Sequence, residues 1–149
     1  MTNNVPFPQA DDFEKVILIV NITDEELLRD TAFMKKYLKG ITGRQVSYFL
    51  SAAMYLNLIN KDKKFTNLGM RIRSISNHKM QIIELLNVLM NDDIIRYAFL
   101  YEKIQHVPLK NDYIAKMILN KYPNYSTQTC RRRGQTVRGW VEWMKKQLR

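Results

Sequence analysis

Few residues in this chain can break a helix or form a covalent cross-link. Among its 149 residues are five glycines, four prolines and one cysteine, Cys130. A single cysteine excludes an internal disulfide framework, and with only His78 and His106 beside it the sequence lacks the ligands of a Cys/His zinc cluster. The longest apolar run, Val16 to Val20, is far shorter than the roughly 20 residues of a membrane helix, and the first 15 residues do not resemble a secretory signal. We therefore expect a soluble cytoplasmic protein without a cofactor, a metal or a membrane partner.

Acidic residues are also in short supply. The 14 Asp and Glu stand against 24 Lys and Arg, which gives a formal net charge of +10. The charge is segregated, because residues 1–30 hold seven acids and two bases, whereas residues 121–149 hold eight bases and one acid. A positive pole attracts polyanions before any specific contact forms. Nucleic acid is therefore the first partner to consider, and a merely solubilising surface is the alternative.

Helical periodicity dominates the sequence. Apolar residues make up 46% of the chain, enough to bury a core, and they recur at spacings of three and four almost throughout. We expect helices over residues 11–20, 23–38 with a break near 30–31, 42–56, 68–72, 80–90, 92–105, 111–121 and 126–148. Two of these begin with the pattern of a capping box, Thr23 with Glu26 and Thr42 with Gln45.

The helix that begins at Thr42 is the most informative stretch. It turns one face inward (Val46, Phe49, Leu50, Ala53 and Leu56) and leaves the other to solvent (Arg44, Tyr48, Ser51 and Tyr55). Asn60 to Thr66 then predicts a short β-ribbon with a basic tip. Two helices, the Thr42 helix and a basic hairpin follow one another in the order of a winged helix. In that fold the third helix enters a major groove and the wing contacts the backbone.

The second half of the chain repeats this plan loosely. We therefore predict a mainly α fold of two winged-helix-like halves, each a helix-turn-helix with a short β-wing, over residues 1–76 and 77–149, packed into one compact unit. The last helix has an inner stripe of Cys130, Gly134, Val137, Val141, Met144 and Leu148, with Trp140 at its border. A second face of this helix carries Arg131, Gln135 and Arg138.

Two stretches carry a family resemblance. The segment from Ile41 to Gly69 follows the pattern T-x-RQ-x-x-YY-x-x-AA-x-YLGL, a basic wing and LT-x-x-G, with departures at Phe49, Asn57 and Phe65. The last helix carries the signature RR-x-x-TV-x-x-W-x-x-W at Arg132, Arg133, Thr136, Val137, Trp140 and Trp143. From about Pro8 to Leu148 the chain resembles a winged-helix module of bacterial restriction-modification proteins. The resemblance implies a DNA-associated module of a defence system, of a kind commonly fused to nucleases or methyltransferases.

Candidate binding residues follow from the chemistry of DNA. Phosphates need Lys, Arg, hydroxyls and helix N-terminal amides, and base edges need Arg, Gln or Asn. The predicted DNA-binding residues are Arg44, Gln45, Ser47, Tyr48 and Ser51 on the Thr42 helix, Lys61, Lys63 and Lys64 on the wing, and Arg131, Gln135 and Arg138 on the last helix. Three have other uses open to them: Gln45 in its capping box, Tyr48 in the core, and Arg138 in a pair with Glu142.

No catalytic arrangement accompanies these residues. Asp62-Lys63-Lys64 fits the D-x-K string of a metal-dependent nuclease, but it lies in the predicted wing without an acid on a preceding strand. Cys130 falls on an inner stripe, which indicates a buried thiol. The sequence therefore predicts a non-enzyme that binds double-stranded DNA with sequence dependence, associated with the nucleoid, in a restriction-modification or related defence system.

Other functions stay open. The chain could be a docking subunit for a nuclease or methyltransferase, binding through its acidic first helix, Trp140 and Trp143, with only non-specific affinity for DNA. A small nuclease with an unrecognised site is a further alternative. A homodimer is compatible with DNA binding, because many DNA readers match a two-fold protein to a palindromic site.

Overall fold

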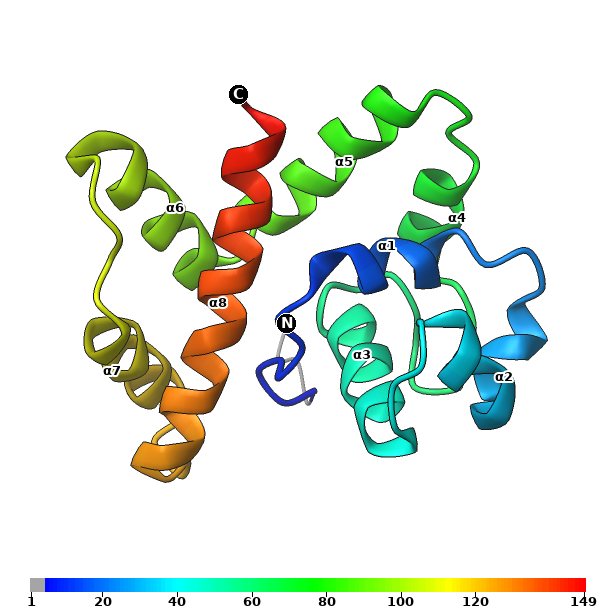
Figure 1. The fold of residues 1–149 in the computed structure, drawn as a ribbon, viewed down its shortest axis with the longest axis horizontal. Helices are drawn as coiled ribbons and strands as arrows, with labels where there is room; N and C mark the ends of the chain where they lie inside the picture. Colours follow the sequence, from blue (N-terminus) through cyan, green and yellow to red (C-terminus); the bar gives the residue numbers. More distant parts are fainter. Residues whose placement is uncertain (1–4) are drawn as a thin grey trace.

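The structure, a computed structural model, describes residues 5–149, and these residues are mainly helical (Figure 1). They form α1 (Phe13–Val20), the 3-10 helix η1 (Glu25–Arg29), α2 (Thr31–Tyr37), α3 (Gly43–Tyr55), α4 (Asn67–Arg73), α5 (His78–Met90), α6 (Asp93–Gln105), α7 (Asn111–Lys121) and α8 (Thr127–Gln147). None of the described helices is long and apolar enough to cross a membrane.

Side-chain caps set the helix starts in the first half. The capping box of α3 is confirmed, because Thr42 Oγ1 accepts from the Gln45 amide at 3.2 Å and Gln45 Oε1 accepts from the Thr42 amide at 3.0 Å. The five residues predicted to face inward from α3 are all buried. The predicted cap at Thr23 is wrong, since Asp24 caps η1 instead. Asp30 caps α2, which confirms the predicted break near residue 30.

The predicted β-wing is wrong. Within residues 5–149 the structure has no strand, and Ile59 and Phe65 form a lone antiparallel bridge. The reason is local, since Asn60 Oδ1 accepts from the amides of both Asp62 and Lys64, at 2.9 and 3.1 Å. The Asn60 side chain closes the five residues between Ile59 and Phe65 into a tight turn. No residues are then left to pair as the strands of a β-ribbon. We call residues 60–64 the lysine turn.

The second half is a three-helix unit of α6, α7 and α8, which α5 connects to the first half (Figure 1). The predicted bounds of α7 are confirmed, and Ser126 caps α8, its Oγ accepting from the Thr129 amide. The inner stripe of α8 is buried from Cys130 to Met144, but Leu148 is 52% exposed because it follows the last helical residue. The described part of this half therefore matches the predicted helices without a wing.

The segment Val5–Asp12 runs between α3 and α8 and joins the two halves (Figure 1). Its backbone is held by side chains of α8. The Ala10 amide donates to Thr136 Oγ1 at 2.9 Å, and Trp140 Nε1 donates to the Ala10 carbonyl at 2.6 Å. Arg133 Nη1 donates to the Phe7 carbonyl at 2.7 Å. These buried bonds satisfy an irregular backbone that would otherwise be costly to remove from water.

Aromatic packing continues this joint into α1. The Phe13 ring lies 5.4 Å from the Trp140 ring and 4.5 Å from the Trp143 ring, centroid to centroid. Trp143 Nε1 also donates to Glu14 Oε1 at 2.9 Å. The predicted boundary after residue 76 falls between α4 and α5, but the segment Val5–Asp12 packs on α8, so the two halves share one core.

The close packing of Gly139 against the segment Val5–Asp12 provides a test of how this segment joins the two halves. A Cβ atom at Gly139 would lie 2.3 Å from the Asp11 carbonyl oxygen, a backbone atom. One at Gly134 would meet only side chains, Asn111 Oδ1 at 3.2 Å and Ile114 Cγ2 at 3.6 Å. We expect Gly139→Ala to lower the free energy of unfolding by about 1–3 kcal/mol because it pushes the segment off α8. Urea unfolding followed by tryptophan fluorescence measures this change.

Gly134→Ala is the matched control on the same helix. Alanine gains about 1 kcal/mol of helix propensity over glycine, and the exposed Asn111 side chain can move aside. We therefore expect Gly134→Ala to be neutral or stabilising. Equal stability of the two variants would contradict the described packing of Val5–Asp12.

Candidate nucleic-acid interface

Helices α3 and α8 begin on the same side of the molecule and flank a cleft of about 230 Å³. The floor of the cleft is the segment around Ala10. Its lining residues are Gln9, Ala10, Asp11, Gln45, Tyr48, Phe49, Arg132, Gln135 and Thr136. The structure thus brings together three of the predicted residues, Gln45 and Tyr48 from α3 and Gln135 from α8. We call this the α3–α8 cleft.

The first turn of α3 offers hydrogen-bond donors at the edge of the cleft. Arg44 is exposed, and its Nε donates to the Tyr48 hydroxyl at 2.7 Å while its guanidinium lies 5.6 Å from the Tyr48 ring centroid. Gln45 Oε1 accepts from Thr42, which leaves the amide NH₂ of Gln45 as its donor. Among the described residues no acceptor is recorded for the amides of Gly43 and Arg44. Amides of this kind at a helix N-terminus favour an anion.

Cations from α2 lie beside this helix start. Lys35 Cε lies 3.4 Å from the position a Cβ would take on Gly43, and Lys35, Lys36 and Lys39 are exposed. The chain reaches this place through a sharp turn, because Lys39 and Gly40 both have positive φ, 68° and 78°. Lys35 and Lys39 are absent from the predicted site. The run of lysines just before Gly40 is the signal that could have identified them.

Arginines of α8 form the opposite side of the cleft. Arg132 is exposed and lines it, next to Gln135 one turn further along α8. Arg131 lies 3.9 Å from Asp112, a pair with both side chains more than half exposed. Such a surface pair is weak, so Arg131 remains available to a stronger anion. Arg132 was not among the predicted contacts.

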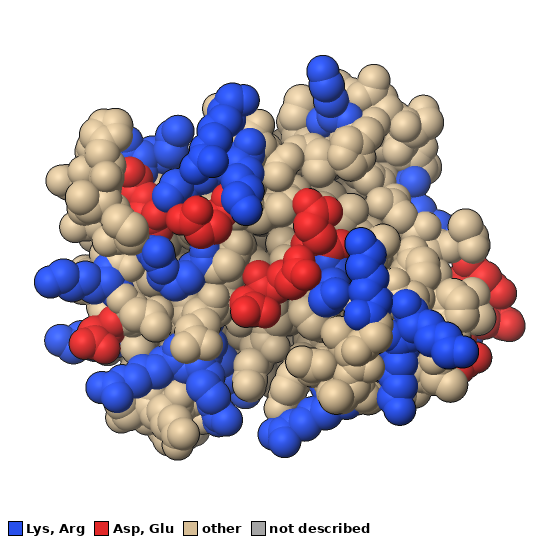
Figure 2. All heavy atoms as spheres, in the orientation of Figure 1, with Lys and Arg blue, Asp and Glu red and all other residues tan. Residues whose placement is uncertain are grey.

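The charges near the cleft are mixed. In Figure 2, Lys and Arg atoms lie along the edge where α3 and α8 begin, and a strip of acidic atoms lies near the start of α1. Asp12 caps α1 by accepting from the Glu14 amide at 3.1 Å, so its carboxylate has a structural role. Asp11 lines the cleft itself. Its carboxylate would oppose a phosphate placed between Arg44 and Arg132.

The lysine turn lies away from the cleft. Arg29 Nη1 donates to the carbonyls of Asp62 and Lys63, at 3.4 and 3.3 Å, and Glu25 Oε1 accepts from the Phe65 amide at 2.6 Å. These contacts tie the turn to η1, and η1 and α2 lie on the side of α3 opposite α8 (Figure 1). Lys61, Lys63 and Lys64 therefore do not share a concave site with the predicted residues of α8.

The rest of the outward face of α3 is partly covered. The predicted contacts Ser47 and Ser51 lie outside the cleft lining, Ser47 exposed and Ser51 half-buried. Further along, Tyr55 is half-buried, and its hydroxyl donates to Asp92 at the start of α6. Burial, followed by the charge of Asp92, raises the pKa of Tyr55. The second half thus covers the end of the face that would enter a major groove in a winged helix.

Arg138, a predicted DNA contact, is held in an ion pair with a buried acid. Its Nη1 donates to Glu102 Oε2 at 3.1 Å and to the Leu109 carbonyl at 3.3 Å. The Glu102 side chain is 2% exposed and also accepts from Lys145 Nζ at 3.0 Å. The alternative partner Glu142 binds Lys145 instead. The sequence pattern could not show this, because Glu102 lies on another helix, 36 residues away.

The signature of the last helix is explained by the joint to the first half. Arg133, Thr136 and Trp140 all bind the backbone of Phe7 or Ala10. Trp140 is fully buried and Trp143 is 6% exposed. These two tryptophans therefore offer no exposed surface to a partner, because they pack against Phe13.

Cys130 and Asp62 are the remaining residues that the sequence analysis considered for chemistry. Cys130 is buried, and burial raises the pKa of its thiol. Asp62 lies in the exposed lysine turn. Across residues 5–149 there is no group of three or more His, Cys, Asp or Glu arranged to hold a metal ion.

Replacing Arg138 separates a structural role from a binding role. Arg138→Met leaves the buried Glu102 with Lys145 alone, and breaking a buried ion pair costs up to about 3–5 kcal/mol. With one cation remaining, we expect a loss of about 1–3 kcal/mol in the free energy of unfolding, measured by urea titration, and unchanged affinity for DNA. Full stability combined with weaker DNA binding would instead indicate that Arg138 contacts DNA.

Comparison with known proteins gives a family. Neither the search of curated proteins nor that of solved structures returned a match. One family model, described as "Domain of unknown function (DUF7226)", matches residues 15–149 and so covers all the helices from η1 onwards and most of α1. The chain belongs to the DUF7226 family.

Proposed function

We propose that this protein binds double-stranded DNA across the α3–α8 cleft, with sequence dependence contributed by the first turn of α3. The observation that carries the proposal is the cleft in which Gln45 and Tyr48 of α3, next to Arg44, lie across from Arg132 and Gln135 in the first half of α8. Phosphate contacts set affinity and orientation, and side chains that reach base edges set preference. The cleft offers both kinds of group.

The phosphate contacts come from both sides of the cleft. Arg44 and the first-turn amides of α3 are assigned to one strand, with Lys35 and Lys39 beside them, and Arg132 of α8 is assigned to the other. Helix N-termini add partial positive charge to these cations. The charge of +10 over the whole chain adds long-range attraction for a polyanion.

Base readout is assigned to Gln45 and Gln135. Because Gln45 Oε1 is held by its capping box, its amide can donate but has no free acceptor atom to complete a bidentate contact to adenine. A donor alone suits the acceptor edges of guanine or thymine. Gln135 has no side-chain bond recorded among the described residues and can present either end.

The biological setting is proposed on the sequence resemblance alone. A chain that holds a duplex in this way would associate with the nucleoid and would serve a restriction-modification or related defence system, where a nuclease or methyltransferase subunit acts on the bound DNA. The proposal needs no catalytic residue, cofactor or metal in this chain.

Paired arginine variants test the interface. We expect Arg44→Ala and Arg132→Ala each to weaken duplex binding several-fold and to reduce the salt dependence of log Kd by about 1, as for one lost phosphate contact. Fluorescence anisotropy with a labelled duplex over a range of salt concentrations measures both quantities. Lys146→Ala is the matched control, since Lys146 is an exposed cation near the opposite end of α8.

Removing an acid gives a test of opposite sign. Asp11→Asn takes a negative charge out of the cleft, so we expect tighter binding to all duplexes in the same assay. The interface is contradicted if Arg44→Ala, Arg132→Ala and Asp11→Asn all leave Kd unchanged while alanine substitutions in the lysine turn weaken it. In that case the turn, and not the cleft, binds DNA.

A further variant tests whether the preference for particular DNA sequences comes from Gln45. Gln45→Glu keeps an oxygen that can cap α3, because Glu also forms capping boxes, but it removes the amide donor. We expect the ratio of Kd values between preferred and other duplexes, taken from a selection of random sequences, to fall toward 1. An unchanged ratio would remove Gln45 as a reader.

A further inference from the structure

Helix α6 carries apolar side chains on two faces. Its inner face, with Ile94, Ile95, Ala98 and Phe99, is buried in the core. Its outer face repeats the same periodicity with Tyr97, Leu100, Tyr101 and Ile104, at the spacings of a helix stripe. Leu100 and Ile104 are 42% and 70% exposed. A helix that is apolar on both sides normally has both sides covered.

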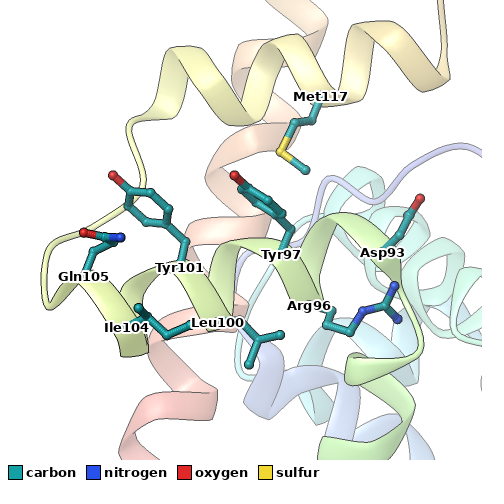
Figure 3. Close-up of a pocket in the computed structure, with 8 residues that line it drawn as sticks. All are labelled: Asp93, Arg96, Tyr97, Leu100, Tyr101, Ile104, Gln105 and Met117. Carbon is teal, nitrogen blue, oxygen red and sulfur yellow. The ribbon is translucent and has the colours of Figure 1, made fainter.

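The outer stripe forms one wall of a groove of about 600 Å³ that α7 completes with Met117 (Figure 3). Two stacked tyrosines, Tyr97 and Tyr101, line it with their rings 6.4 Å apart, and Tyr113 of α7 stacks on Tyr97 from outside the lining, at 6.0 Å between centroids. Stacking restricts the rings and gives the groove a fixed wall before anything binds. In Figure 3, Tyr97 and Tyr101 point toward Met117 of α7, whereas Leu100 and Ile104, which also line the groove, project from α6 away from α7.

The exposed charges that flank the groove are mainly positive, and the exposed acid of α7, Asp112, lies 3.9 Å from Arg131. Arg96 and Lys103 lie on the outer flank of α6, and Lys110 and Lys116 lie at the start and on the outer side of α7, all exposed. The one acid in the lining, Asp93, already accepts from Lys121 at 2.9 Å, and this bond lowers the pKa of Asp93. The groove is therefore an apolar channel between unbalanced cations.

We propose that the groove between α6 and α7 binds an amphipathic helix of a partner protein, with apolar side chains facing the groove and acidic side chains on its flanks. Apolar anchors at spacings of three and four residues match the stripe of α6. Acidic flanks complement Arg96, Lys103, Lys110 and Lys116. A second copy of this chain fits less well, because two-fold pairing would bring the Arg96 and Lys103 flanks of two cationic molecules together.

DNA is not the occupant of this groove. Its lining is mainly aromatic and aliphatic, and it lies on α6 and α7, whereas the α3–α8 cleft lies on other elements. The partner site is therefore independent of the proposed DNA interface. One chain could hold a duplex and a partner protein at the same time.

A designed peptide tests the proposal on the full chain. The probe is a synthetic, end-blocked helix of about 18 residues, five turns, with Leu at spacings of three and four, Glu on both flanks and Ala elsewhere. Two matched peptides keep the length, one with the Leu positions scrambled and one with Lys in place of Glu. Fluorescence anisotropy gives each Kd, and an NMR titration identifies the residues whose amides shift.

The expected result is saturable binding of the acidic amphipathic peptide, at least about tenfold tighter than either matched peptide, with shifts in α6 and α7. Leu100→Ser and Ile104→Ser should each weaken that binding by about tenfold or more. Both residues are exposed, so the variants should fold. Ile83→Ser, at an exposed apolar residue of α5, is the control that leaves binding unchanged.

Three results would overturn the proposal. The first is no saturable binding of the acidic peptide, and the second is equal binding of the scrambled peptide. The third is a dimer of the unmodified protein in analytical ultracentrifugation that Leu100→Ser converts to monomer, since a second copy would then fill the groove. Duplex affinity measured in the same variants should stay unchanged, which separates this proposal from that of DNA binding.

Discussion

The hydrogen bonding of Ala10 to α8 is the constraint on which the rest of the structure depends. The Ala10 amide donates to Thr136 and the Ala10 carbonyl accepts from Trp140. Helix α8 thus bonds both backbone groups of one residue in an irregular segment. Gly139 lets the neighbouring carbonyl of Asp11 approach the helix where no side chain would fit. Through this segment α8 is fixed against α1 and α3, which sets the width of the α3–α8 cleft.

The cleft explains why an interface can form without a wing. In a winged helix the second contact to the backbone comes from a hairpin beside the recognition helix. Here the corresponding hairpin is a tight turn bound to η1, and Asp92 and Tyr55 join the far end of α3 to the second half. The first half of α8 takes the place of the wing in our proposal, with Arg132 and Gln135 across the cleft from Gln45 and Tyr48. The groove on α6 and α7 remains exposed on separate elements.

Local features of the fold could be predicted from the sequence, and contacts between distant residues could not. The capping box at Thr42, the break at Asp30 and the extent of α7 follow from short-range patterns. The prediction of a β-wing was wrong because the Asn60 side chain accepts hydrogen bonds from two amides of its own loop and so forms a tight turn. The ion pair of Arg138 could not be predicted because its partner Glu102 lies on another helix, and only the folded structure shows that Arg132 lines the cleft beside α3.

An NMR titration of the full chain with a short duplex tests most directly whether α3 and α8 bind one DNA molecule. The account predicts that the backbone amides of Gly43, Arg44 and Gln135 shift together, with one common Kd, and that amides of the lysine turn shift less. Shifts confined to the lysine turn, or to one of the two helices alone, would contradict it.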